Sequence, residues 1–159
     1  NGDMDAAIDH LRKAGLKKLL RYGAVVLHFE SIGPGDPAFG YVPYYHFHIR
    51  NAESEKMGHI NFRVGDTPHV RYAAGHIGYA VDEAFRGHGF AYQACRAIEP
   101  LVFSLRESVI LTCNPDNAPS IKTIEKLGAL PLGLCDVPES DPMYANGVRV
   151  KLRYRWDKP

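Results

Sequence analysis

Long apolar segments, paired cysteines and an excess of one charge sign are all missing from this sequence. No apolar run approaches the ~20 residues that a membrane-spanning helix needs. The three cysteines, Cys95, Cys113 and Cys135, are an odd number and form no Cys-x-x-Cys pair, which argues against a disulfide scaffold and favours a reducing cytoplasm. The net charge of +1 gives no electrostatic reason to expect nucleic acid or an anionic membrane as a partner.

The first residues also lack the features of a secretion signal. The chain starts Asn1-Gly2-Asp3-Met4, and no apolar stretch of a signal peptide follows. We therefore expect a cytoplasmic protein. Residues 3–21 carry apolar side chains at helical spacing opposite basic ones, which predicts an amphipathic helix packed on the domain.

Length and composition predict one globular domain. A chain of 159 residues, 45% of them hydrophobic and 23% charged, is long enough to bury a core without disulfides or metals. No repeat, low-complexity tract or linker divides it. We expect a single domain over residues 1–159, with its core region at about 23–156.

The first half of the chain has the pattern of short strands separated by turns. Apolar or alternating runs bounded by Gly, Pro, Asn and Asp predict strands. These runs are 25–29, 44–50, 59–64 and 75–81. The polar turn at 51–56 joins the second and third runs, which predicts an antiparallel hairpin.

The second half mixes helices and strands. Apolar residues recur at three- and four-residue steps from Phe90 to Leu105, which predicts a helix that Pro100 kinks or ends early. A buried-looking strand follows at 109–113. A second helix is predicted at about 118–127, with Asn117 as N-cap and a glycine just past its end.

The last predicted strand, 148–156, alternates between basic and apolar side chains. Its basic face consists of Arg149, Lys151, Arg153 and Arg155. Such a face suits a polyanion, but charge also protects an exposed edge strand from pairing with other molecules, and we favour an edge strand. Together the elements predict an α+β fold.

A glycine-rich loop opens the first long helix. Arg86-Gly87-His88-Gly89-Phe90-Ala91 follows the fourth strand, and glycines at a helix N-terminus let backbone N–H groups approach a phosphate. A Walker A loop is excluded because Phe90-Ala91 stands where Gly-Lys-Ser/Thr should begin. A dinucleotide-binding unit needs an acidic residue at the end of the next strand, and this chain has Cys113-Asn114 there.

The stretch from Gly75 to Ala129 resembles the GNAT (GCN5-related N-acetyltransferase) superfamily. The family signature Arg/Gln-x-x-Gly-x-Gly/Ala corresponds to residues 86–91, with the arginine immediately before Gly87. Residues 114–120 resemble the second conserved block of this superfamily. The local sequence is similar to that of a bacterial subgroup of predicted acetyltransferases. The resemblance implies a mostly antiparallel central sheet, a splayed central strand pair and flanking helices.

The resemblance also implies where acetyl-CoA binds. The CoA pyrophosphate would lie on Arg86, Gly87, His88, Gly89, Phe90 and Ala91. The pantetheine would pair with the backbone of Tyr79, Ala80 and Val81, as an added strand. Asn114 and Asn117 would lie near the pantetheine or its thioester.

The catalytic groups are less clear from the resemblance. Many relatives place a general-acid tyrosine at the position of Ile124, so that Tyr144 or Tyr79 would have to replace it, or the thiolate would leave unaided. Some relatives carry a glutamate base near the start of the fourth strand. This chain has His76 there, which makes His76 our candidate base, acting through water. A purely structural role for His76 is equally open.

Other reactive side chains fit ordinary roles. Cys113 at a strand end is interpreted as a small buried hydrophobe rather than a nucleophile. His46, His48 and His59 lie on neighbouring strands, but no further ligand at a recognisable spacing supports a metal, and we predict none. We expect them to line or flank the acceptor pocket with Arg50, Asn61 and Arg63. A buried Arg63 beside the cleft would imply a carboxylate- or phosphate-bearing acceptor, and a surface salt bridge is the open alternative.

The sequence therefore predicts an N-acetyltransferase that moves the acetyl group of acetyl-CoA to an unidentified primary amine. The partner would be a small-molecule or peptide amine, with neither nucleic acid nor membrane, and a homodimer is possible. The alternative is an inactive CoA-binding sensor or interaction module, which the isoleucine at position 124 keeps open.

Overall fold

Antiparallel hairpins build the larger of two sheets in the structure, a computed structural model that describes residues 20–159. Its five strands lie in chain order, and each pairs antiparallel with the next. They are β1 (Arg21–Tyr22), β2 (Val25–Gly33), β3 (Tyr44–Arg50), β4 (Lys56–Arg63) and β5 (Ile77–Val81). The predicted hairpin at 51–56 is confirmed, since β3 pairs directly with β4.

The smaller sheet has three strands in the order β6-β8-β7. They are β6 (Ser108–Cys113), β7 (Leu130–Asp136) and β8 (Val150–Asp157). The basic strand β8 pairs antiparallel on both sides, so the interpretation as a charge-protected edge strand is wrong. Alternating charge marks a strand with two different faces, but it does not reveal how many neighbours pair with that strand.

Two longer helices and several short ones connect the strands. The helices are α2 (Phe90–Leu105), α3 (Ala118–Lys126) and α4 (Pro142–Ala145). Single turns of 3₁₀-helix occupy Pro37–Phe39 (η1) and Glu83–Phe85 (η3), and a π-helical turn, η2, occupies Val70–Ala74. Helix α2 continues through Pro100 to Leu105, so the predicted early stop is wrong.

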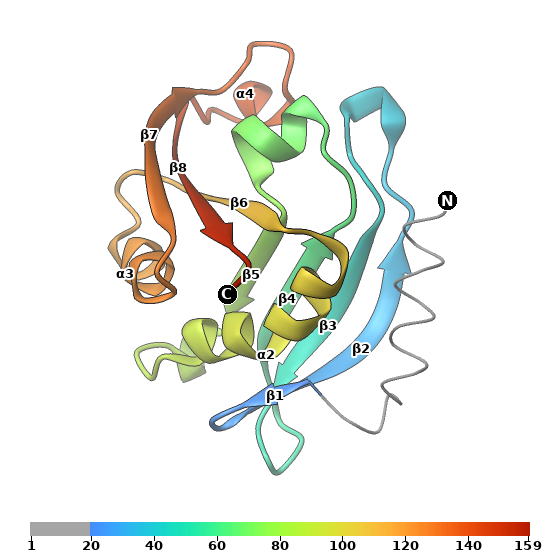
Figure 1. Cartoon of the computed structure of the whole chain (residues 1–159), viewed down its shortest axis with the longest axis vertical. Helices are drawn as coiled ribbons and strands as arrows, with labels where there is room; N and C mark the ends of the chain where they lie inside the picture. The colour runs from blue at the N-terminus through green and yellow to red at the C-terminus, as the bar shows by residue number, and fades with distance from the viewer. Residues whose placement is uncertain (1–19) are drawn as a thin grey trace.

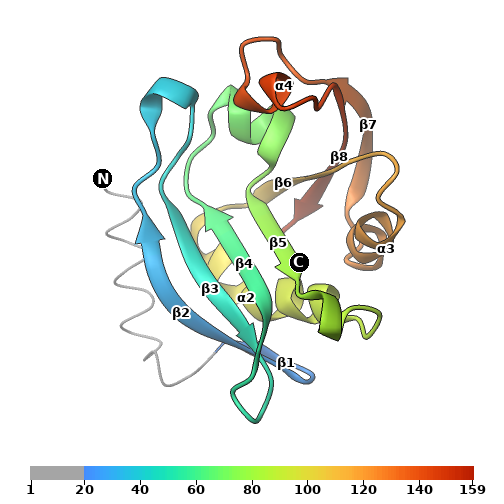
Figure 2. The same ribbon diagram turned by 180° about the vertical axis from the view of Figure 1, so that it is seen from behind.

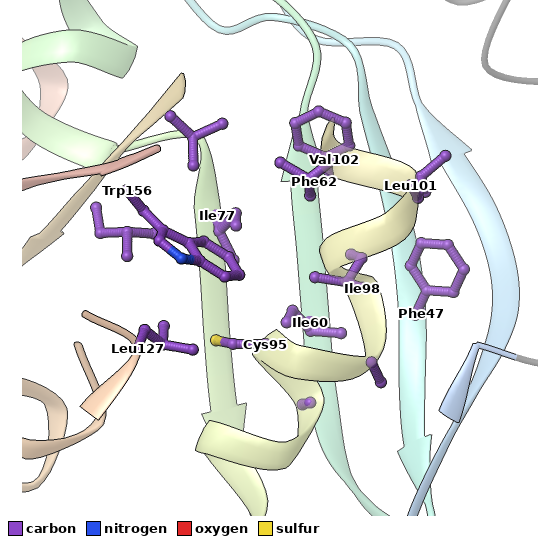
Figure 3. Close-up of a cluster of buried hydrophobic side chains, with 14 of the residues drawn as sticks. Phe47, Ile60, Phe62, Ile77, Cys95, Ile98, Leu101, Val102, Leu127 and Trp156 are labelled. Carbon is purple, nitrogen blue, oxygen red and sulfur yellow. The ribbon is translucent and has the colours of Figure 1, made fainter. Parts of the chain in front are cut away.

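The core lies between α2 and one face of the larger sheet. Figure 3 shows side chains of α2 facing those of β3, β4 and β5, with Trp156 and Leu127 closing the side toward the smaller sheet. The core positions on β3 and β4 alternate with partly exposed ones, as a sheet with one covered face requires. Burial of this apolar surface is what holds helix and sheet together.

The opposite face of the larger sheet is polar. In Figure 2, no helix of the described residues crosses the front of β3 and β4. The partly exposed residues on that face are Tyr44, His46, His48, Arg50, His59, Asn61 and Arg63. The three histidines lie next to one another as expected, since the ring centroids of His48 and His59 are 5.5 and 5.6 Å from the ring centroid of His46.

A backbone hydrogen bond joins the two sheets where β5 begins. The backbone N–H of His76 donates to the carbonyl of Ile110 over 2.8 Å, and β5 and β6 belong to different sheets beyond that point. Figures 1 and 2 show the two strands diverging from this junction. The free edge of β5 therefore faces an opening rather than a paired strand, as a splayed strand pair requires.

The predicted N-terminal helix, residues 3–21, lies outside the described residues except for its last two positions. Of these, Leu20 packs against the core and Arg21 begins β1. The other predicted helices and strands are present, with ends that coincide or are shifted by up to four residues. The turns η1, η2 and η3 and the short helix α4 were not predicted, because single turns carry too little periodic signal.

Candidate functional site

A cleft of about 530 Å³ lies between the diverging strands β5 and β6 and reaches the start of α2. We call it the β5–β6 cleft. Its lining residues are Ala74, Ile77, Gly78, Tyr79, Ala80, Val81, Arg86, Ala91, Thr112, Cys113, Asn114, Asn117, Pro119, Ser120, Thr123 and Lys151. One wall is the unpaired edge of β5, which offers backbone N–H and C=O groups to an extended, amide-containing ligand.

The far end of this cleft is the N-terminus of α2. Gly89 precedes the helix in a left-handed conformation, with φ of 75°, and no side chain caps the first turn. Gly87 has φ of 85°, and a side chain added there would meet nothing within 4 Å. Uncapped N–H groups, the positive end of the helix dipole and open space in front of glycines form an anion-binding arrangement.

The structure brings most of the predicted CoA-binding residues to this cleft. Those that line it are Tyr79, Ala80, Val81, Arg86, Ala91, Asn114 and Asn117. Those that do not are Gly87, His88, Gly89 and Phe90, which form the turn leading into α2. The Arg86 side chain donates through Nε to the carbonyl of Val81 over 2.9 Å, which holds its guanidinium beside the turn.

Tyr79 and Ser120 form a hydroxyl pair inside the cleft. The two oxygens are 2.7 Å apart, so a residue of β5 bonds to the first turn of α3 across the opening. Burial raises the pKa of Tyr79 well above its ordinary value, although the bond to Ser120 acts in the opposite direction. The phenol therefore stays protonated near neutral pH and is available as a hydrogen-bond donor.

Cys113 lies in the same cleft and is almost fully buried. Burial raises the pKa of its thiol, so the reactive thiolate is disfavoured. This geometry agrees with the interpretation of Cys113 as a buried hydrophobe.

His76, the candidate base, does not reach the cleft. Its side chain is fully buried, its Nδ1 accepts from the backbone N–H of Ile110 at 2.8 Å, and its Nε2 lies 3.1 Å from Oδ1 of Asp66. Burial lowers its pKa to about 4. Both ring nitrogens thus have partners at the junction of β5 and β6, where Nδ1 takes the place of a backbone carbonyl as acceptor for the N–H of Ile110. This geometry argues against a role of His76 as the base.

Ile124, at the position of the family's tyrosine, belongs to the hydrophobic core. Its side chain is 1% exposed and does not line the cleft. Position 124 thus contributes packing of α3 in this chain and supplies no group to the site.

A second cleft of about 520 Å³ adjoins the first, and we call it the β4–α4 cleft. Its lining residues are Pro34, Gly35, Asp36, Tyr41, Val42, Tyr44, Asn61, Arg63, His69, Ala74, Met143 and Asn146. Ala74 lines both clefts, which places their inner ends side by side. Asn61 and Arg63 line this cleft as expected. His46, His48 and His59 do not line it, although Nδ1 of His46 is hydrogen-bonded to Oδ1 of Asn61 at 2.6 Å.

His69 and Asp141 form a buried pair in the wall of the β4–α4 cleft. Nδ1 of His69 lies 2.7 Å from Oδ2 of Asp141, and the two side chains are 9% and 4% exposed. Nε2 has no hydrogen-bond partner among residues 20–159. Because no fully buried side-chain nitrogen or oxygen in those residues lacks a partner, Nε2 retains some exposure, and His69 lines the cleft. A carboxylate that holds Nδ1–H fixes the tautomer in which Nε2 accepts a proton.

Sequence reasoning missed this pair and also Lys151, which lines the β5–β6 cleft. His69 and Asp141 are 72 residues apart, and neither stands in a motif. The only available signal for Lys151 was its place on the basic face of the last strand, which we interpreted as an edge.

Within residues 20–159, the structure places no group of three or more His, Cys, Asp and Glu side chains that is suited to a metal ion. None of the helices in this range is long and apolar enough to cross a membrane.

Solved acetyltransferases share this fold. The microcin C7 self-immunity acetyltransferase MccE, solved with acetyl-CoA and AMP, is 22% identical, with a TM-score of 0.55 over 72% of this chain and 61% of that one. A GNAT-family acetyltransferase of Bacillus anthracis is 22% identical, with a TM-score of 0.54 over 71% of this chain and 66% of that one. The ribosomal-protein-S5-alanine acetyltransferase of Vibrio fischeri is 20% identical, with a TM-score of 0.53 over 72% of this chain and 62% of that one. The chain thus spans less than two thirds of each.

No curated protein sequence matches the chain significantly. The family of acetyltransferase (GNAT) domains, however, matches residues 30–130, more than half of the chain. This range contains the unpaired edge of β5, the glycine turn before α2 and the strand β6 that diverges from β5. The sequence match and the shared fold agree, and the chain belongs to the GNAT acetyltransferase family.

Proposed function

We propose that this protein is an acetyl-CoA-dependent N-acetyltransferase and that acetyl-CoA binds in the β5–β6 cleft. The observation that carries the proposal is the continuity of two features in one cleft. An unpaired strand edge suits an amide chain, and an uncapped helix N-terminus suits a pyrophosphate. The family to which the chain belongs and the acetyl-CoA named with MccE point to the same ligand.

The pyrophosphate would lie on the turn that precedes α2. Phe90, Ala91 and the following residue present N–H groups that no side chain caps, and Arg86 adds a positive charge that is already oriented by Val81. These groups bind phosphate oxygens without rearrangement. The positive φ at Gly87 and Gly89 explains why other residues are disfavoured in this turn.

The pantetheine and thioester would occupy the gap between the strands. The backbone of Tyr79, Ala80 and Val81 would pair with the pantetheine amides. The thioester would then lie toward the closed end, near the Tyr79–Ser120 hydroxyl pair. The phenol of Tyr79 would donate to the thiolate as it leaves, which takes over the role that Ile124 does not perform.

The acceptor amine would enter through the β4–α4 cleft. An amine at neutral pH arrives protonated, so a base must remove a proton before nitrogen attacks the thioester carbonyl. His69 has the required free Nε2 in this cleft, and Asp141 stabilises the imidazolium that forms. The proton taken from the ammonium passes to solvent, and the C–N bond forms as the C–S bond breaks. The attacking nitrogen then loses its second proton as the amide forms, and a proton taken up by the thiolate lets CoA leave as its thiol.

The acceptor would be a primary amine, which fits the name of a further solved protein with this fold, a ribosomal L7/L12 alpha-N-protein acetyltransferase. Because acetyl-CoA is available inside the cell, the proposed reaction places the protein in the cytoplasm. The core position of Ile124 also favours a second candidate, a CoA-binding module without catalysis.

A turnover assay separates the two candidates. The protein is incubated with acetyl-CoA and a panel of amines that includes peptides with free N-termini, amino acids, polyamines and aminoglycosides. Free thiol is measured over time, and products are checked by mass spectrometry. We expect thiol release that depends on one class of amine. Tight acetyl-CoA binding without amine-dependent thiol release would support the binding module instead.

A further inference from the structure

Arg63 lies where the two clefts meet. Its guanidinium donates through Nη1 to the backbone carbonyls of Ala74 and Gly75, at 3.2 and 3.1 Å. It occupies the space above Gly78, where an added Cβ would lie 2.8 Å from Nη2. Gly78 lines the β5–β6 cleft, and Arg63 lines the β4–α4 cleft. The absence of a side chain at position 78 therefore lets a guanidinium lie between the two.

The charge of Arg63 has no acidic partner in the described part of the chain. No Asp or Glu carboxylate of residues 20–159 comes within 4.0 Å of it, although other arginines on the surface do form such pairs. Nη2 and Nε have no hydrogen-bond partner in this range. Since no fully buried side-chain nitrogen there lacks a partner, both atoms retain some exposure, and Arg63 lines the β4–α4 cleft. Burial lowers the pKa of Arg63, but a guanidinium stays charged at neutral pH.

Lys151 brings a second cation to the same place. It lines the β5–β6 cleft from β8 and, within residues 20–159, has neither an ion-pair nor a hydrogen-bond partner. Burial lowers the pKa of its ammonium group, which Cys113 counteracts and the charge of Arg63 reinforces. The Arg63 guanidinium packs over Gly78, which lines the same cleft as Lys151, so both cations border this cleft and would attract an anion bound there.

We propose that the acceptor amine carries an anionic group, a carboxylate or a phosphate, and that Arg63 and Lys151 bind it. This inference rests on the proposed transferase function. The free Nη2 and Nε of Arg63 form a planar pair of donors that matches two anionic oxygens. An anion held there fixes the acceptor between the two clefts, with His69 on one side and the thioester on the other.

The test compares amines that differ only in the anion. Amino acids are paired with their carboxamides, and phosphoethanolamine is paired with ethanolamine, so that carboxylate and phosphate are examined separately. For each compound, kcat/KM is measured by thiol release, and binding to the CoA-saturated protein is measured by calorimetry. We expect the anionic member of at least one pair to be preferred by about tenfold or more, as for other charge-assisted hydrogen bonds.

Variants assign the preference to the two cations. Arg63→Gln and Lys151→Gln should each reduce the ratio of anionic to neutral kcat/KM by about tenfold. Gly78→Ala should act in the same direction, because its methyl group displaces the guanidinium. Arg50→Gln is the matched control, since Arg50 lies on the same sheet face but lines neither cleft, and it should leave the ratio unchanged.

The outcome is separable from that of the transferase proposal. Acetyl-CoA affinity is measured first, and it should be similar in the wild type, Arg63→Gln and Arg50→Gln. A wild-type protein that binds acetyl-CoA but shows no preference for anionic amines, in turnover or in binding, overturns the inference and leaves the transferase intact. A preference that survives in both Arg63→Gln and Lys151→Gln, with both variants folded by their melting temperature, overturns it as well.

Discussion

The two adjoining clefts are built in different ways. The β5–β6 cleft is lined mainly by one continuous part of the chain, residues 74–123, and offers strand-edge and helix-terminal backbone groups. The β4–α4 cleft collects side chains from the loop after β2, from β3 and β4, from η2 and from α4. Backbone recognition leaves a local trace in the sequence, as spaced glycines. Side-chain recognition assembled from distant segments leaves none.

This difference matches the ligands proposed for the two clefts. A cosubstrate with a fixed pyrophosphate and two amides can be bound by backbone groups, which tolerate change in the surrounding side chains. An acceptor must be distinguished from other amines, and this requires particular side chains such as Arg63 and His69. Variants that affect one cleft and spare the other therefore test the comparison.

The largest effect on turnover is expected in the β4–α4 cleft. His69→Gln should lower kcat/KM for the amine by about 10²- to 10⁴-fold, because it removes the base. Asp141→Asn keeps an oxygen for the bond from the backbone of Met143. Its amide NH2, however, would face Nδ1 of His69 and favour the tautomer with a protonated Nε2, so the variant should lower kcat/KM by a similar factor. Steady-state kinetics check both, and the dissociation constant for acetyl-CoA should not change. Equal acetylation rates in His69→Gln and the wild type would exclude His69 as the base.

A second variant examines the junction that the two clefts share. The folded state holds His76 neutral, with its pKa lowered from 6.5 to about 4, whereas the unfolded state takes up a proton near 6.5. Stability should therefore be constant above pH 6.5 and fall as the pH drops from 6.5 towards 4, by up to about 3 kcal/mol in total. Urea unfolding at a series of pH values measures this loss.

His76→Asn keeps an acceptor for the N–H of Ile110 and cannot titrate. It should cost about 1 kcal/mol at neutral pH through the lost contact with Asp66, and it should flatten the stability curve between pH 6.5 and 4. An unchanged slope in His76→Asn would show that another group causes the loss in acid.

Much of the fold could be predicted because its signals are local. The apolar periodicity predicted the helix that begins at Phe90, and the residue type of Asn117 predicted its role as N-cap of the next helix. His76 is the contrasting case. A histidine at a strand end can act as a catalytic base or as a buried hydrogen-bond acceptor. Only its contact with Ile110 of β6, 34 residues later in the chain, favours the second role.

The candidate site divides in the same way. Seven residues that line the β5–β6 cleft were predicted through the family resemblance, whose motifs are contiguous in the sequence. Lys151, His69 and Asp141 were not, since each gains its role from a contact across the fold. The basic face of β8 was visible in the sequence, but its central position between β6 and β7 depends on pairing that alternation does not encode.

Ile124→Tyr tests whether the missing family tyrosine can simply be restored. The side chain is 1% exposed in the core, so the larger ring should destabilise the protein by about 1–3 kcal/mol. It should not raise kcat, because position 124 does not open into the cleft. Thermal unfolding and turnover measure the two effects, and a gain in kcat would mean that α3 can rotate a residue at 124 into the site.

The smallest effect is expected for Tyr79→Phe in the β5–β6 cleft. The ring remains, but the bond to Ser120 and the proposed hydrogen bond to the leaving thiolate are lost, and the latter is worth about 1 kcal/mol or about fivefold in kcat. Binding of acetyl-CoA should change little, since strand pairing uses the backbone. Thr123→Val, in the same cleft, is a control that removes a hydroxyl of similar size. Equal losses in the two variants would argue against a specific role for the phenol.

The most direct test of the central claim is a calorimetric titration with acetyl-CoA. The wild type should bind with micromolar affinity, and Gly89→Asp should bind on the order of a hundredfold more weakly, because a carboxylate and backbone strain are placed at the anion-binding turn. Gly133→Asp carries the same change at a positive φ of 91° in open space on β7 and should bind like the wild type. No binding by the wild type, or equal binding by Gly89→Asp, would contradict the assignment of the β5–β6 cleft to acetyl-CoA.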